Sequence, residues 1–255
     1  MSELALSTTA LRKRFGDLVA IDGIDLAVPR GSFYGFLGPN GAGKSTTIKC
    51  LTGLLRPTSG SFRILDMNPL TEPVAVKRKI GVMPEDLALF DRLTAAETLS
   101  FVGQVHGLDD TTIRKRSDEL LTLMDLTSAQ DDQVADYSHG MRKKIALAAA
   151  LLPAPRLVFL DEPFEGIDAV ASRQIKELLA HFVRSGGTVF LTSHILEIVE
   201  RLCDQIGIIS KGRLVAQGPL DSLRNDGSGR TLEQMFFDLV GAESTHMPEL
   251  DWLSK

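Results

Sequence analysis

The chain has 255 residues, of which 44% are hydrophobic and 24% are charged, and its formal net charge is −5 at pH 7. These values are typical of a globular protein with one large domain or two closely joined ones. The acidic balance disfavours a protein that holds nucleic acid by bulk electrostatics, because such proteins carry a basic surplus. No stretch approaches the roughly 20 apolar residues of a membrane span. Serines and threonines interrupt the N-terminal segment, so we expect no secretory signal.

The two cysteines, Cys50 and Cys203, lie far apart in apolar segments. Neither has the Cys-x-x-Cys or Cys/His spacing of a metal site. We therefore expect buried, reduced thiols, which fit a reducing compartment.

The first third of the chain predicts strands around one helix. Strands are expected where apolar residues alternate or form short runs, at 4–15, 19–28, Phe33–Leu37, Ser61–Leu65 and Ile80–Met83. The helix is expected at Thr46–Leu54 and closes near Gly53.

The middle of the chain changes to a helical pattern, with apolar residues at steps of three and four. Helices are expected at Ala95–His106, Thr111–Met124 and Gly140–Leu151. Strands and helices then alternate again. The expected strands are Leu157–Leu160, Thr188–Thr192, Gln205–Ile209 and Arg213–Ala216, and the expected helices are Val170–Val183 and Ile195–Leu202. Asn225–Arg230 predicts a flexible link to a last helix at Leu232–Val240.

The alternation of strands and helices indicates an α/β protein. Strands separated by helices form a mostly parallel sheet that is covered on both faces. The helical block in the middle of the chain predicts a subdomain inserted into this α/β frame.

A glycine-rich segment, GPNGAGKST at Gly38–Thr46, carries the strongest chemical signal. It matches G-x-x-x-x-G-K-[ST] and lies between an apolar strand and a helix, where backbone amides can bind phosphate. Lys44 would reach the β- and γ-phosphates, and the Ser45 hydroxyl would bind Mg²⁺. The nucleotide-binding candidates are Gly38, Pro39, Asn40, Gly41, Ala42, Gly43, Lys44, Ser45 and Thr46. Alone, the motif indicates a nucleoside triphosphate and leaves kinases, GTPases and motors open.

Two adjacent acids, Asp161 and Glu162, follow the apolar run Leu157–Leu160. At the end of a buried strand beside the phosphate loop, Asp161 would hold Mg²⁺ and Glu162 would act as general base toward the attacking water. Acids at a strand end can also simply face solvent. The phosphate loop upstream favours the catalytic interpretation.

Between these motifs lies YSHGM, at Tyr137–Met141. The Ser138 hydroxyl and the Gly140 amide could bind a γ-phosphate at a helix N-terminus, although the segment alone could be an ordinary helix cap. In order and position, the three motifs resemble those of the nucleotide-binding domains of ABC transporters, whose signature is usually LSGGQ. YSHGM differs from that consensus sequence at three of five positions. The resemblance covers roughly Leu4 to Gly218.

The resemblance implies a fold of the P-loop NTPase type, specifically that of ABC ATPases. We expect a mostly parallel sheet, an antiparallel β subdomain and a helical subdomain inserted at about 86–152. The ABC ATPase domain would span 1–218, and 219–255 would form a C-terminal extension.

Further positions match the family one by one. Phe15 stands where an aromatic ring stacks on adenine, although a core residue of a strand would look the same. Asp168 matches the loop that links two active sites across a dimer, although it could be a helix N-cap. His194 matches the histidine that touches the γ-phosphate and helps to orient the catalytic water.

Two positions depart from the family. Glu85 stands where the family usually has a glutamine; its charged oxygen can still bind Mg²⁺ but would repel the γ-phosphate without the metal. We therefore expect Glu85 to make nucleotide binding more dependent on Mg²⁺. Phe164 stands where Thr or Ser is common, and the sequence offers no reason for it beyond packing.

The resemblance also implies a mechanism and partners. The chain would hydrolyse ATP with Mg²⁺, and a second copy or a related ATPase subunit would complete each site. It would drive integral membrane permease subunits from the inner, cytoplasmic face of the cell membrane, without binding nucleic acid. The sequences of the motifs are similar to those of the bacterial branch of the family that exports drugs and antibiotics.

Two other functions are weighed against this one. A soluble ABC ATPase that acts on a ribosome, DNA or a scaffold complex would usually carry tandem motor domains, coiled coils or basic arms, and the sequence has none. A P-loop kinase would need an acceptor pocket and would not need Asp168 and His194 in this order.

Overall fold

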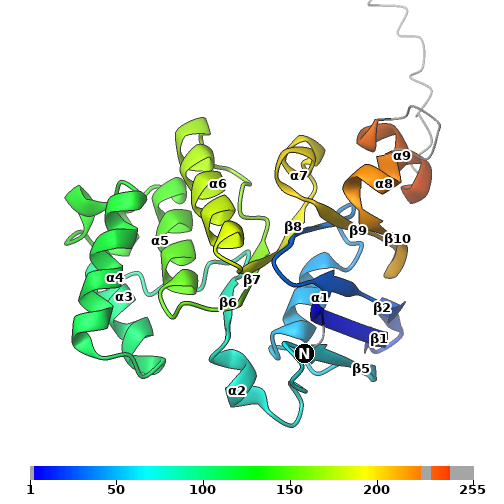
Figure 1. Cartoon of the computed structure of the whole chain (residues 1–255), viewed down its shortest axis with the longest axis horizontal. Coiled ribbons are helices and arrows are strands. Elements are labelled where there is room, and N and C mark those ends of the chain that lie inside the picture. The colour runs from blue at the N-terminus through cyan, green and yellow to red at the C-terminus, as the bar shows by residue number, and fades with distance from the viewer. Residues whose placement is uncertain (1–2, 225–230, 242–255) are drawn as a thin grey trace, which may run out of the picture.

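A computed structural model describes residues 3–224 and 231–241. Its strands form a six-stranded sheet and a smaller antiparallel sheet, and Figure 1 shows helices α3 to α6 on the side away from the antiparallel strands. This arrangement confirms the expected α/β fold with a mostly parallel sheet. The expected link at Asn225–Arg230 lies outside the described residues. The domain boundaries at about 86–152 and at 218 stay predictions.

The six-stranded sheet has the order β10-β9-β4-β8-β7-β6, with the bounds Arg213–Pro219, Gln205–Ser210, Phe33–Leu37, Thr188–Ser193, Leu157–Asp161 and Ile80–Met83. Neighbouring strands are parallel except for β9 and β10, which pair antiparallel as a hairpin. Every residue of β4, β7 and β8 is buried. This explains why these strands are continuous apolar runs rather than alternating ones.

The antiparallel sheet is built around the long strand β1. Its strands are β1, β2, β3 and β5, with the bounds Leu4–Phe15, Leu18–Ile24, Ala27–Pro29 and Ser59–Ile64. The expectation of one strand over 19–28 was wrong, because the chain breaks between β2 and β3. The Thr8 hydroxyl donates to the Ile24 carbonyl and accepts from the Leu26 amide, so a side chain replaces ladder bonds at the break.

The helices follow the expected order, with ends that shift by up to three residues. Helices α1, α3, α4, α5, α6, α7 and α9 span Lys44–Leu51, Ala95–Val105, Asp110–Leu123, His139–Leu151, Ala169–Arg184, Leu196–Leu202 and Leu232–Val240. Four short elements were not predicted: α2 and α8 at Pro73–Lys77 and Leu220–Arg224, and 3₁₀ turns at Thr127–Ala129 and Val134–Asp136. Within the described ranges, no helix combines the length and hydropathy needed to cross a membrane.

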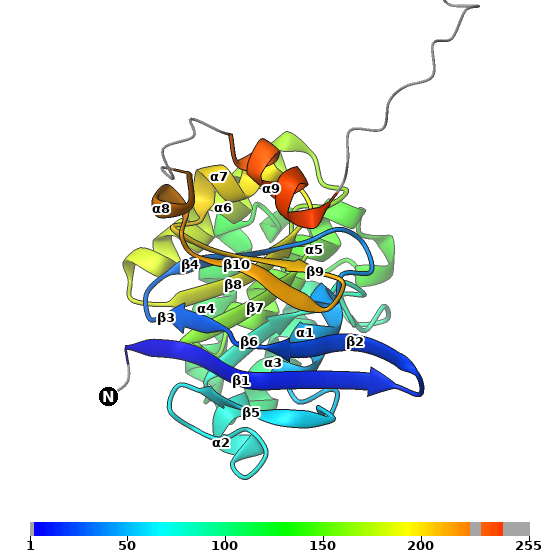
Figure 2. The same cartoon turned by 90° about the vertical axis from the view of Figure 1, so that its right-hand side faces the viewer.

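The large sheet separates two apolar cores, one on each face. Figure 2 shows the antiparallel strands stacked on one side of this sheet. Along β4, Phe33 and Leu37 belong to the core shared with the helices, whereas Tyr34 and Phe36 face the core around α1 and the antiparallel strands. Alternation along a strand produces this division. Because both faces are packed, the loops at the carboxyl ends of β4, β7 and β8 are held together on one edge of the sheet.

Candidate nucleotide-binding and catalytic site

The phosphate loop joins β4 to α1, and its glycines are required by its backbone. Gly41 and Gly43 have φ angles of 78° and 111°, in the region that side chains disfavour. A Cβ on Gly43 would lie 2.6 Å from the Ala20 carbonyl, and one on Gly38 would lie 2.5 Å from the Ile209 carbonyl. The loop therefore packs against its neighbours while it leads into the N-terminus of α1, where amide groups and the helix dipole favour phosphate.

Lys44 begins α1 and turns back over the loop. Its ammonium donates to the Gly38 carbonyl at 2.8 Å and lies 3.4 Å from the Glu162 Oε1 atom. Both side chains are more than nine-tenths buried. The structure thus brings together the cation of the phosphate loop and the expected general base, which are far apart in the sequence.

The two acids after β7 have different surroundings. Asp161 accepts a 2.6 Å hydrogen bond from the Thr192 hydroxyl, which in turn accepts from the Glu162 amide at 3.0 Å. Glu162 has a φ of 48°, an uncommon value for a residue with a side chain, so the chain turns sharply there. Thr192 was not among the residues predicted for the site. A threonine at the end of a buried strand carries no motif by which it could have been found.

His194 lies after β8, beside the strand that carries the acids. Its Nδ1 atom lies 3.0 Å from the Oε2 atom of Glu162. The imidazole is 41% exposed, in contrast to the buried carboxylate. Lys44 and His194 therefore each face a different oxygen of Glu162, and the expected catalytic residues form one cluster.

Glu85 comes after β6 and lies near the start of α1. Its Oε2 atom accepts a long hydrogen bond, 3.4 Å, from the Ser45 hydroxyl. A hydroxyl and a carboxylate are oxygen donors that suit Mg²⁺, so this pair fits the expected ion. Among the described residues, no cluster of three or more His, Cys, Asp or Glu side chains is arranged to hold a metal.

Several of these groups line a cleft of about 610 Å³. Of the expected residues, the lining includes Phe15, Asn40, Gly41, Gly43, Lys44, Ser45, Thr46, Glu85, Glu162 and His194. Gly38, Pro39, Ala42 and Asp161 lie outside this lining. Further lining residues, which were not predicted, come from β2, the β9–β10 turn and the segment after β7: Leu18, Val19, Ala20, Glu165, Lys211 and Gly212. Phe15 is 45% exposed at the cleft, and the Lys13 ammonium lies 4.8 Å from its ring centroid.

The remaining candidates form a second cluster. Ser138 caps α5 by accepting from the Met141 amide, and Asp168 caps α6 by accepting from the Val170 and Ala171 amides. These amide bonds hold the pKa of Asp168 below its usual value, so the side chain is anionic at neutral pH. A Cβ on Gly140 would lie 3.7 Å from an Asp168 oxygen and 4.0 Å from the Ser138 oxygen. None of the three residues lines the cleft around Lys44.

A phosphate loop, a buried carboxylate and a histidine in one cleft define the class of protein: a nucleoside triphosphate hydrolase of the P-loop type. The family model for the ABC transporter matches residues 21–165, more than half of the chain. The chain belongs to the ABC transporter family, of which it is an ATP-binding and ATP-hydrolysing subunit.

Two curated proteins and one solved structure illustrate the relationship. The daunorubicin resistance ATP-binding protein DrrA3 of Streptomyces coeruleorubidus is 37% identical over 91% of this chain and 74% of its own length. The linearmycin resistance ATP-binding protein LnrL of Bacillus subtilis (strain 168) is 38% identical over 90% of this chain and 74% of its own. A solved ATP-binding subunit of an ABC transporter, 31% identical, covers 92% of this chain and 99% of its own, with a TM-score of 0.87.

Proposed function

We propose that two copies of the chain, or this chain and a related subunit, bind ATP between them and separate after hydrolysis. One observation carries this proposal: the cluster of Ser138, Gly140 and Asp168 is built like a phosphate-binding helix terminus but lies outside the cleft that contains Lys44. A second chain would supply that cluster to the cleft. ATP then joins the two chains, and loss of the γ-phosphate releases them.

Within one cleft, each side chain has a separate role. Lys44 and the loop amides bind the phosphates, and Phe15 stacks on the adenine. Glu162 accepts the proton of the attacking water, a role that suits a carboxylate aimed into the cleft. His194, in contact with the second oxygen of Glu162, fixes the direction of that carboxylate and reaches the γ-phosphate.

We propose that Mg²⁺ accompanies the nucleotide. Ser45, Glu85 and Asp161 are the residues that would hold it, directly or through water. The ion would supply positive charge to the β- and γ-phosphate oxygens. Because Ser45 and Glu85 are already within 3.4 Å of each other, little rearrangement would be needed to bring both oxygens to one cation.

The dimer is tested with Glu162→Gln, which keeps the shape of the side chain and removes the base. We expect this variant to bind ATP, to hydrolyse it very slowly and to have the mass of a dimer in light scattering with ATP and Mg²⁺. The matched control adds Gly140→Ala, because a Cβ there makes only ordinary contacts within the chain but would obstruct the approach of a γ-phosphate. That double variant should stay monomeric. A monomeric Glu162→Gln chain at saturating ATP would contradict the proposal.

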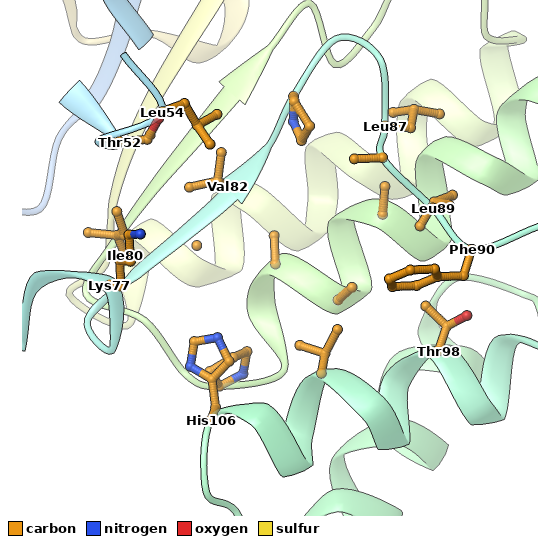
Figure 3. A pocket seen from close by; sticks show the side chains of 18 residues that line it. Thr52, Leu54, Lys77, Ile80, Val82, Leu87, Leu89, Phe90, Thr98 and His106 are labelled. Atoms are coloured by element: carbon orange, nitrogen blue, oxygen red, sulfur yellow. The ribbon is translucent and has the colours of Figure 1, made fainter. Parts of the chain in front are cut away.

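A groove beside β6, the edge strand of the six-stranded sheet, is the proposed docking site for the permease subunits. It has a volume of about 370 Å³ and lies between the sheet and the helices α3 and α5 (Figure 3). Its wall is largely apolar and includes Phe90, which is 54% exposed, and Leu54, which is 63% exposed. Apolar side chains at such a surface commonly mark a protein interface.

The docking proposal is tested in cells that express the chain with its permease. Phe90→Asp should shift the chain from the membrane fraction to the supernatant while the ATPase activity of the purified chain stays unchanged. Leu123→Asp is the control, since Leu123 is similarly exposed, at 51%, and lies outside the groove. Equal membrane fractions for the two variants would contradict docking at this groove, and association with ribosomes or DNA instead would contradict a role in transport.

We further propose that the transporter is an exporter of apolar compounds. The support is the similarity to proteins named for resistance to daunorubicin and linearmycin. The direction of transport is measured with inside-out membrane vesicles that carry the chain and its permease. ATP should drive a fluorescent apolar compound into these vesicles, and Glu162→Gln should abolish that accumulation. ATP-driven loss of the compound from the vesicles would contradict export.

A further inference from the structure

Lys143 is a buried cation that joins helix α5 to the turn after β7. The residue is only 3% exposed, and its ammonium donates to the Glu162 carbonyl at 2.7 Å and to the Glu165 carbonyl at 2.6 Å. The ion pairs found among the described residues do not include Lys143. Two backbone carbonyls therefore satisfy its charge.

Burial of this charge is costly, because desolvation lowers the pKa of Lys143, and the negative charges of Glu165, Glu162 and Glu85 only oppose that effect. A buried methionine would fill a similar space without the cost of desolvation. What the ammonium adds is a pair of directional hydrogen bonds to one short turn.

That turn sets the direction of the catalytic carboxylate. Glu162 has a φ of 48°, a strained value that persists only where the surroundings hold it. The Glu165 amide donates to the Glu162 carbonyl at 3.3 Å, and the same carbonyl accepts from Lys143. Lys143 thus fixes both ends of the turn from outside it, while the Glu162 side chain reaches Lys44 and His194.

Lys143 also belongs to the helix that carries the second cluster. Helix α5 is capped by Ser138 and includes Gly140, which lies three residues, or about one turn, before Lys143. The same helix packs against α3, α4, α6 and β6. A displacement of α5 against β7 would therefore move the Lys143 ammonium and the turn that it holds.

We propose that Lys143 is a positioning residue that makes the orientation of the Glu162 side chain depend on the position of helix α5. The inference rests on the proposed function, in which Glu162 is the general base and α5 presents Ser138 and Gly140 to a second copy. Lys143 thereby couples two roles of helix α5. In its packed position, α5 presents Ser138 and Gly140 to the partner's site, and through Lys143 it also holds the chain's own base in place.

The test compares Lys143→Met, which removes the donor, with Lys143→Arg, which keeps a charged donor. For Lys143→Met we expect kcat to fall by about 10²-fold, the usual cost of a displaced catalytic group, while KM and the affinity for ATP stay unchanged. Lys143→Arg should recover part of kcat. The matched control is Lys176→Met, because Lys176 reaches the same turn only through the ring of Phe164, 5.6 Å away.

A second readout separates positioning from general stability. Hydrogen exchange of the amides between residues 162 and 168 should quicken in Lys143→Met, while the amides of β7 and α5 stay protected. The smaller variant Lys143→Gln serves if the methionine variant does not fold. A wild-type kcat and wild-type exchange in the folded neutral variant would overturn the inference.

The proposed function is tested separately in the Glu162→Gln background. If Glu162→Gln forms the ATP-dependent dimer, Glu162→Gln/Lys143→Met should form it too, because Lys143 is not needed for ATP binding. Failure of Glu162→Gln itself to dimerise would count against the proposed function. A dimer in that background together with a wild-type kcat in Lys143→Met would count against the coupling alone.

Discussion

The Nδ1 atom of His194 lies 3.0 Å from the Oε2 atom of Glu162, and the other oxygen of that carboxylate lies 3.4 Å from the Lys44 ammonium. One buried carboxylate is therefore held between a lysine and a partly exposed imidazole. The lysine begins the helix after the phosphate loop and the histidine follows β8, so two elements far apart in the sequence fix the direction of one carboxylate.

Replacement of His194 by alanine tests the positional role of the imidazole. We expect kcat to fall by about 10²-fold, the usual cost of a displaced catalytic group. ATP binding should be preserved, because Lys44 and the loop amides are unchanged. Equilibrium binding of a fluorescent ATP analogue and single-turnover hydrolysis measure the two effects. A wild-type single-turnover rate would contradict the role of His194.

Thr192→Val removes one hydroxyl that serves both acids. The Asp161 carboxylate would lose its 2.6 Å donor, and the Glu162 amide would lose its acceptor in a buried place. We expect a loss of about 1–3 kcal/mol in the free energy of unfolding, as for other buried polar groups left without a partner. Chemical denaturation measures this loss. Thr192→Ser, which keeps the hydroxyl, should lose less, and equal losses would contradict the importance of the hydrogen bonds.

Glu85→Gln tests the effect of the acid beside Ser45. A neutral amide would not repel the γ-phosphate, so ATP affinity without Mg²⁺ should rise relative to the wild type, and the ratio of affinities with and without Mg²⁺ should shrink. Isothermal titration calorimetry with ATP in the presence of Mg²⁺ or of a chelator gives both constants. An unchanged ratio would contradict our account of Glu85.

Gly43→Ala tests the packing of the phosphate loop. The added Cβ would meet the Ala20 carbonyl at 2.6 Å, and the backbone there has a φ of 111°. We expect loss of ATP binding, because the loop must move away from β2. Gly53→Ala is the control, since Gly53 also has a positive φ but no heavy atom lies within 4 Å of the added Cβ. That control should lose some stability and still bind ATP.

Much of the fold and site could be predicted because the signals are local. The strand at Ile80–Met83 and the helix at Leu232–Val240 have the expected bounds, since each has a clear apolar pattern. The proximity of the phosphate loop, Glu162 and His194 could also be predicted, because motif order and strand–loop–helix context limit where these residues can lie.

The missed features depend on contacts between distant parts of the chain. The break between β2 and β3 is stabilised by Thr8, at least sixteen residues away, and Asp161 is held by Thr192, thirty-one residues away. Lys143 reaches the Glu162 carbonyl from nineteen residues away. In the sequence, each of these residues looks like an ordinary member of its strand or helix, and only the packed structure shows its partner.

The most direct test of the shared site is the ATPase rate per chain across a dilution series that spans the monomer–dimer equilibrium. We predict that the rate rises in proportion to the fraction of dimer, measured at the same concentrations, and that Gly140→Ala lowers the rate at every concentration. A constant rate per chain in samples that are fully monomeric, unaffected by Gly140→Ala, would contradict the claim that a second copy completes the site.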